Sequence, residues 1–149
     1  MTTQDTKHFR PAYHFTPQAH WMNDPNGLVF HEGVYHLFFQ YHPNSCDWGP
    51  MHWGHATSRD LLHWKEHEVA LEPDALGMIF SGSAVIDAHN TSGLGEPGQA
   101  PWVAIFTHHD AEAEQAGRSD FQHQSLAFSL DEGRTWHKYA GNPVLPNPG

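Results

Sequence analysis

The stretch ATSRDLLHW at residues 56–64 decides the fold, because a second stretch of the same design, AFSLDEGRTW, follows at residues 127–136. In both stretches an Ala opens a β-like run, a Ser and an Asp stand two positions apart, and a Trp closes the segment. The two copies lie about seventy residues apart, a spacing typical of repeated structural units. The sequence therefore predicts two units of one repeating architecture.

Short apolar runs surround each copy of this stretch. They are rich in β-branched and aromatic residues and are bounded by Gly, Pro, Asn or Asp, which is typical of strands. Two successive four-stranded units with almost no helix indicate a β-propeller, and we expect the first blade at about 24–71 and the second at about 78–140. The first unit is predicted to hold strands at 28–31, 34–41, 52–58 and 64–70, and the second at 78–87, 101–108, 122–130 and 135–139.

The later copy of the repeated stretch resembles the Asp-box turn found between outer strands of some propeller blades. It places Ser129, Asp131 and Gly133 at alternate positions before Thr135 and Trp136. The short polar side chains are suited to bond turn amides, and the indole to pack between sheets. We predict a structural role for this turn and no chemistry.

Composition narrows the class of partner. The 149 residues include seven Lys or Arg against seventeen Asp or Glu, which gives a net charge of −10. Such an acidic chain is not suited to bind nucleic acid or an anionic membrane, so neither is expected as a partner. Six Trp within 13% aromatic residues favour a neutral, polyhydroxylated ligand whose C–H faces stack on rings.

Cysteine content and the N-terminal residues bear on the compartment. Cys46 is the only cysteine, so no internal disulfide forms, and its polar surroundings predict a free surface thiol. Residues 1–17 contain no apolar core typical of a signal peptide. A cytoplasmic protein and a chain recorded without its leader fit these observations equally well.

Fifteen His residues raise the question of a metal site. The pair His52 and His55 lies in a strand-like segment that sends the two rings to opposite faces. A second candidate group is His108, His109 and Asp110, but neither group has the spacing of a recognised metal motif. We therefore predict no metal and no cofactor.

The segment WMNDPNG at residues 21–27 places one carboxylate, Asp24, directly behind an indole. Pro25 fixes φ, and Asn26 and Gly27 tolerate positive φ, so the segment is predicted to reverse the chain in a tight turn. Asp24 would stand at the first position of that turn.

Three further segments with polar and aromatic residues lie at expected strand ends, as WMNDPNG does. One shared site would explain the positions of all four. In a propeller, strand ends near the central axis converge on one shallow funnel. A carboxylate, amides, aromatic rings and a hydroxyl would then assemble a sugar pocket. The four segments are residues 21–24, 39–43, 48–55 and 80–83.

From about residue 10 onward the chain resembles glycoside hydrolase family 32, the β-fructofuranosidases that include invertases, levanases and exo-inulinases. The resemblance implies a five-bladed β-propeller, usually followed by a β-sandwich, of which this chain could supply about two blades. It rests on WMNDPNG, FQYHPN, WGPMHWGHATSRDLLHWKE, FSGSAV and SLDEGRTWHKYAGNPVL, in the order and spacing of the family.

The resemblance implies roles for individual residues. Asp24 resembles the catalytic nucleophile that attacks the anomeric carbon of a terminal fructosyl unit, and Asn23 would hold the sugar beside it. The other implied residues of the fructosyl pocket are Gln40 as a hydrogen-bonding group, Trp48 as an aromatic wall, Phe80 and Ser81 as the lining of the other side, and Trp21 and Trp53 as further walls. For Trp53, ordinary packing inside a blade is an equal alternative.

The implied mechanism is retaining, so it needs a second carboxyl group roughly 5 Å from the nucleophile as acid and base. The resemblance expects that Glu in a Glu-Cys segment and a stabilising Asp in an Arg-Asp-Pro segment. Neither is present, because Arg59 and Asp60 precede Leu61, and Ser45 precedes Cys46. We expect a chain truncated before its acid/base Glu, and an isolated polypeptide that releases little or no fructose.

Other functions stay open at this point. A non-catalytic remnant would bind fructosyl units through the same groups without cleaving them. A related five-bladed hydrolase of arabinose or xylose would use an inverting arrangement, against which WMNDPNG argues. The residues do not decide between water and a sugar as fructosyl acceptor, between β-2,1 and β-2,6 linkages, or among oligomeric states. The scarcity of Lys and Arg favours unphosphorylated sucrose or fructan as substrate.

Overall fold

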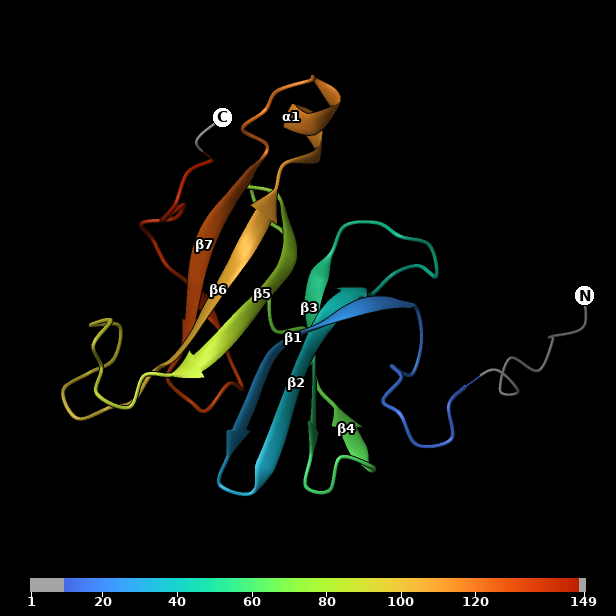
Figure 1. The fold of residues 1–149 in the computed structure, drawn as a ribbon, viewed down its shortest axis with the longest axis vertical. Coiled ribbons are helices and arrows are strands. Elements are labelled where there is room, and N and C mark those ends of the chain that lie inside the picture. The colour runs from blue at the N-terminus through green and yellow to red at the C-terminus, as the bar shows by residue number, and fades with distance from the viewer. Residues whose placement is uncertain (1–9, 148–149) are drawn as a thin grey trace, which may run out of the picture.

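The computed structural model describes residues 10–147, which form two four-stranded antiparallel sheets (Figure 1). Residues 1–9, part of the stretch assessed above for a leader, and residues 148–149 lie outside the described part. The predicted all-β class and the two four-stranded units are confirmed. The first sheet contains β1 (Trp21–His31), β2 (Val34–His42), β3 (His52–Ser58) and β4 (Trp64–Glu66), and the second β5 (Met78–Ile86), β6 (Trp102–His109), β7 (Gln122–Ser129) and β8 (His137–Lys138).

Strand order follows chain order in both sheets, as expected for a propeller blade. The helix α1 (Ala111–Gln115) lies in the connection between β6 and β7. Both fourth strands are shorter than predicted, because the chain leaves the sheet and returns for one further bridge. That bridge pairs Trp53 with Leu71 in the first sheet and Gln124 with Leu145 in the second. The repeated sequence therefore builds a repeated structure, including its irregularity.

The predicted turn at Asp24 is wrong, because residues 21–31 form one continuous strand. The pairing of β1 with β2 shifts register between Met22 and Pro25, and again between Asn26 and Val29. These β-bulges accommodate Pro25, which lacks an N–H, and Gly27, which has φ of +50°. Pairing with the buried middle of β2 outweighs the local turn preference, so Asp24 stands on a bulged strand.

The main hydrophobic core lies between the two sheets. Phe38 and Trp53 from the first sheet meet Ile79 and Phe106 from the second, and each of these four side chains is fully buried. Trp136 of the repeated stretch packs against this core, with its ring edge-on to Phe38 at 5.4 Å. The core therefore fixes the position of one sheet against the other, and with it the relative position of their strand ends.

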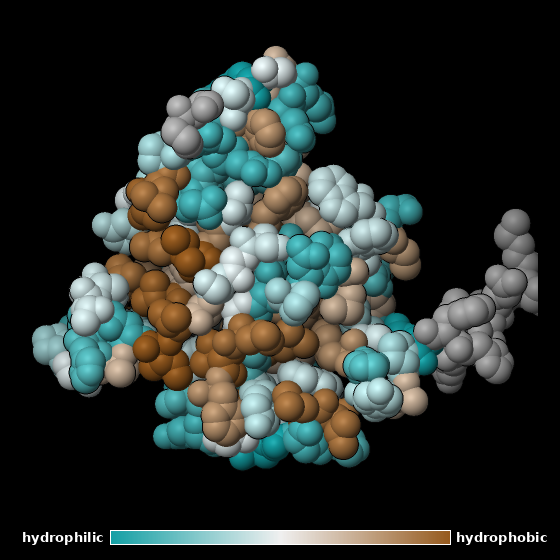
Figure 2. Space-filling view, in the orientation of Figure 1, coloured by the Kyte–Doolittle hydropathy of each residue, from teal (hydrophilic) through white to brown (hydrophobic). Residues whose placement is uncertain are grey.

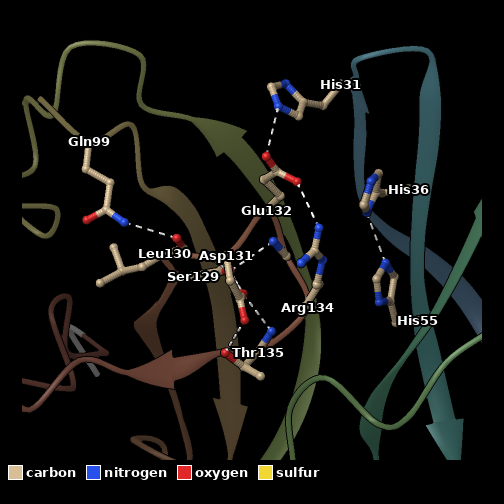
Figure 3. A network of polar contacts seen from close by, with 11 residues as sticks. His31, His36, His55, Gln99, Ser129, Leu130, Asp131, Glu132, Arg134 and Thr135 are labelled. Atoms are coloured by element: carbon tan, nitrogen blue, oxygen red, sulfur yellow. Dashed lines mark hydrogen bonds and ion pairs between the residues drawn. The ribbon is translucent and has the colours of Figure 1, made fainter.

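The Asp-box-like turn has the structural role predicted for it (Figure 3). Ser129 Oγ donates to Asp131 Oδ1 at 2.8 Å, while the amide and hydroxyl of Thr135 donate to the two carboxylate oxygens of Asp131 at 2.8 and 2.7 Å. The earlier copy uses the same design, since Ser58 Oγ donates to Asp60 Oδ1 at 3.1 Å. The same kind of turn thus connects β3 to β4 in the first sheet and β7 to β8 in the second.

The connection from β4 to β5 is fastened to the second sheet by charged and polar side chains. Lys138 Nζ forms an ion pair with Asp74 Oδ2 at 2.7 Å and also donates to the carbonyl of Glu72. The buried ring of His108 lies 3.3 Å from Asp74 Oδ1 through Nε2 and 2.7 Å from Ser125 Oγ through Nδ1. This network attaches the chain between the sheets to β6, β7 and β8.

Some large hydrophobic side chains are exposed in the described part of the chain, and Figure 2 shows hydrophobic patches on the viewed face. Leu28 and Phe30 on β1 are 68% and 58% exposed, and Val85 on β5 is 60% exposed. Within residues 10–147, no helix is long and apolar enough to cross a membrane.

Candidate functional site

The candidate residues gather where the two sheets meet at one end of their strands. The start of β1 lies beside the end of β2 because the strands are antiparallel, and β1 also contacts β5. The hydroxyl of Ser81 donates to Asp24 Oδ2 at 2.9 Å. Residues separated by 57 positions in the sequence therefore meet, and both are exposed to solvent.

A β-bulge presents Ser81 to Asp24. The pairing of β5 with β6 shifts register between Ile79 and Gly82. A Cβ on Gly82 would lie 2.1 Å from the carbonyl oxygen of Ile105, so no larger residue fits there without moving the backbone. Because β5 and β6 approach each other closely at Gly82, they set the direction in which the side chain of Ser81 points away from the sheet.

Trp21 and Asn23 are joined to each other at the start of β1. Trp21 Nε1 donates to Asn23 Oδ1 at 2.8 Å, and the Trp21 amide donates to the carbonyl of Ser45 at 2.9 Å. Both side chains are half-buried. The indole thus fixes the side-chain amide of Asn23, the residue directly before Asp24.

An aromatic wall lies next to Ser81, the residue that donates to Asp24. The ring of Trp48 is 53% exposed and lies edge-on to the ring of Phe80, with centroids 6.3 Å apart. Phe80 directly precedes Ser81, so the wall and the hydroxyl come from one segment of β5. An exposed indole such as that of Trp48 is suited to stack on the apolar face of a sugar ring.

Trp53 is not part of this exposed aromatic wall. Its side chain is 0% exposed in the core between the sheets, and its Nε1 donates to the carbonyl of Phe80 at 3.0 Å. The expectation of Trp53 as an exposed wall is therefore replaced by the packing alternative. Trp53 supports the site from behind by holding the backbone of Phe80.

Gln40 is 2% exposed and is linked to a residue to which the sequence analysis gave only a turn role, Asn26. In the amide orientation that satisfies both of its atoms, Asn26 accepts from Gln40 Nε2 at 3.0 Å and donates to the carbonyl of Pro25 at 3.1 Å. Asn26 is itself 2% exposed. No direct signal for this contact was present in the sequence, because the predicted turn assigned Asn26 to a different role.

Two other groups of side chains have residue types typical of a catalytic or a metal site. His108 and Ser125 together with Asp74 have the composition of a catalytic triad, but Ser125 and His108 are each 0% exposed and can reach no substrate. Burial also lowers the pKa of His108 to about 4. This group is structural.

A possible metal-binding group lies at the opposite end of the strands, beside a groove of about 640 Å³. His31, Glu32 and Glu132 place one ligand atom each within 4.8 Å of one another. Glu132 is already paired there, with Arg134 at 3.3 Å and His31 at 4.0 Å (Figure 3). A cation would therefore compete with Arg134, and the sequence expectation of no metal stays a prediction.

Comparison with known proteins identifies the family. The Glycosyl hydrolases family 32 N-terminal domain matches residues 14–149. The chain is 60% identical to the levanase of Bacillus subtilis over 95% of its own length and 20% of that protein. It is 53% identical to an extracellular exo-inulinase of Aspergillus niger, over 94% of the chain and 28% of the relative. The chain thus spans less than a third of the length of these relatives.

Solved structures agree with the sequence comparison. The exo-inulinase of Aspergillus awamori is similar with a TM-score of 0.82 and 52% identity, over 93% of this chain and 29% of that one. The fructofuranosidase of Schwanniomyces occidentalis complexed with fructose is similar with a TM-score of 0.83 and 47% identity, over 97% of this chain and 28% of that one. From the fold, the ordered motifs and these similarities together, the chain belongs to glycosyl hydrolase family 32, within the N-terminal domain of that family.

Proposed function

We propose that this chain forms part of a β-fructofuranosidase that releases terminal fructose from sucrose or β-fructans, with Asp24 as the nucleophile. The observation that carries the proposal is the exposed Asp24 carboxylate, held by Ser81 next to the wall of Trp48 and Phe80. Relatives named levanase and exo-inulinase, and a similar fructofuranosidase complexed with fructose, support the same substrate class.

The chemistry follows from the position of the carboxylate. Asp24 attacks C2 of the fructosyl unit, the C2–O bond to the leaving group breaks, and an ester joins the sugar to Asp24. Water then cleaves the ester with net retention. The second carboxyl group of this mechanism must protonate the leaving oxygen, and no segment of this chain resembles the Glu-Cys motif that would supply it. The proposal therefore assigns that group to residues beyond this chain.

Hydrolysis by the full-length encoded protein tests the proposal. We expect fructose release from sucrose, inulin or levan, and a loss of at least about 10³-fold in kcat for Asp24→Asn. The matched control is Asp47→Asn, at an exposed carboxylate outside the strands, and it should keep nearly full activity. A full-length protein that binds fructose but hydrolyses none of these sugars would replace the proposal with the non-catalytic fructosyl-binding remnant.

An activated donor separates the nucleophile from the missing acid. In β-fructosyl fluoride the leaving group is fluoride, which needs little help from a proton donor. The 149-residue chain should therefore hydrolyse sucrose little or not at all, yet form an ester at Asp24 with this donor. Peptide mass spectrometry locates the ester, and a label on any other side chain would refute the role of Asp24.

A further inference from the structure

The ring of Phe80 is supported from behind by a second ring, that of His109, which entered the sequence analysis only as part of a candidate metal group. His109, at the end of β6, stacks on Phe80 with ring centroids 4.3 Å apart and planes 7° apart. Trp48 meets Phe80 edge-on at 6.3 Å with an angle of 79°. The wall beside Asp24 is therefore three rings deep, and its innermost member, His109, is 4% exposed.

Two polar contacts fix the orientation of His109 within its own plane. The amide nitrogen of Gln122 donates to Nδ1 at 3.1 Å, so Nε2 carries the proton and donates to Glu114 Oε2, also at 3.1 Å. Phe121 closes a third side, edge-on at 5.5 Å. A ring bonded through both nitrogens and packed on an edge has little freedom to rotate, so the Phe80 ring rests on a fixed surface.

The segment that supplies Glu114 is itself ordered by local contacts. Asp110 Oδ1 accepts from the amides of Glu112 and Ala113 at 3.0 Å, which caps α1, and the amide of Asp110 donates to the carbonyl of Phe121 at 2.8 Å. Ala113 is the buried residue of the helix. The helix therefore presents Glu114 to His109 from a defined position.

The backbone of Phe80 does not depend on His109, because Trp53 Nε1 holds its carbonyl at 3.0 Å. Loss of the His109 ring would release the Phe80 side chain alone. The hydroxyl of Ser81 could then still reach Asp24, while the surface offered to a sugar changes. This separation predicts an effect on substrate binding without an equal effect on folding or on the nucleophile.

We propose that His109 is a positioning residue that sets the ring plane of Phe80 and thereby the fit of a terminal fructosyl unit against Asp24. The inference rests on the proposed function and deepens it, because it names the residue behind the wall. Glu114 and Gln122 act through His109 rather than on the sugar.

Steady-state kinetics of the full-length protein with sucrose test this role. His109→Ala should raise KM about 5- to 20-fold while kcat falls less than about 3-fold, because uniform binding of the fructosyl unit is lost. His109→Phe keeps an aromatic ring against Phe80 and should return KM to within about 3-fold of the original value. The control His123→Ala removes a ring that contacts His108 and should leave KM unchanged.

The outcomes separate this inference from the proposed function. An unchanged KM in His109→Ala, with only a lower melting temperature, would make His109 merely structural and overturn the inference, although Asp24 would keep its role. If the full-length protein releases no fructose, the proposed function fails first. If His109→Ala does not fold, Glu114→Ala at an exposed side chain should raise KM about 2- to 5-fold, and an unchanged KM there overturns the inference equally.

Discussion

Ser81 Oγ and Asp24 Oδ2 are joined by a hydrogen bond of 2.9 Å that connects the first strands of the two sheets. The bond crosses from one repeated unit to the other at the end of the strands where the candidate residues gather. It orients the carboxylate without burying it, since both side chains are exposed. A carboxylate that must attack a carbon atom needs both properties, a fixed direction and an open approach.

Ser81→Ala should lower kcat/KM for sucrose about 10- to 150-fold in the full-length protein, because a hydrogen bond to a charged group contributes about 1.5–3 kcal/mol. Ser83→Ala, two positions along the same strand, is the matched control and should behave like the unmodified protein. Equal kinetics for the two variants would show that Asp24 needs no support from β5.

Asn26→Ala should reduce the free energy of unfolding by about 1–3 kcal/mol, because it leaves buried polar atoms of Gln40 and Pro25 without their partner. Urea denaturation of the protein measures this loss. The exposed Asn44→Ala should change the free energy by less than about 0.5 kcal/mol. A stable Asn26→Ala would mean that the amide of Gln40 finds another acceptor.

Asp131→Ala should cost about 1–2 kcal/mol of stability, because three hydrogen bonds of the turn end on this carboxylate. Asp131→Asn keeps one acceptor oxygen and should lose less. Neither variant should change KM for sucrose, since the turn lies at the other end of the strands from Asp24. A kinetic effect without a loss of stability would contradict the structural role.

Stability should fall as the pH falls from about 6.5 to about 4. Burial, together with the neighbouring His67, lowers the pKa of His36 to about 4 and that of His55 to about 3. The unfolded chain therefore binds more protons than the folded one in this window, so the contribution is fully present above pH 6.5 and lost below it. Each ring should cost about 1–2 kcal/mol by pH 5.

Chemical denaturation at pH 7 and pH 5 measures this pH dependence. His55→Phe keeps a ring stacked on Phe38, which lies 4.4 Å from His55, and should flatten the dependence. The exposed His89→Gln should leave it unchanged. A dependence that His55→Phe does not alter would assign the proton uptake to other groups.

Much of the architecture was predictable because it depends on local patterns. Alternating apolar residues placed β3 at residues 52–58 without error, and the repeated Ser and Asp positions identified both outer turns. The segment at Asp24 was predicted incorrectly for the same reason. Its Pro, Asn and Gly favour a turn locally, whereas pairing with the buried middle of β2 favours an extended strand. Which preference is stronger is decided only in the folded protein.

The sequence by itself determined the family, the two repeated sheets and the residue types that the proposed site uses, because each of these is written in spacing and local composition. Only the tertiary structure decided which residues touch. It placed Trp53 in the core instead of the pocket, joined Asn26 to Gln40, and put His109 behind Phe80. Such contacts arise when strands pair in register within each sheet and the two sheets then pack across a shared core. Side chains that are far apart in the sequence together fix the distance and angle between strands and sheets. No short stretch of sequence therefore determines these contacts.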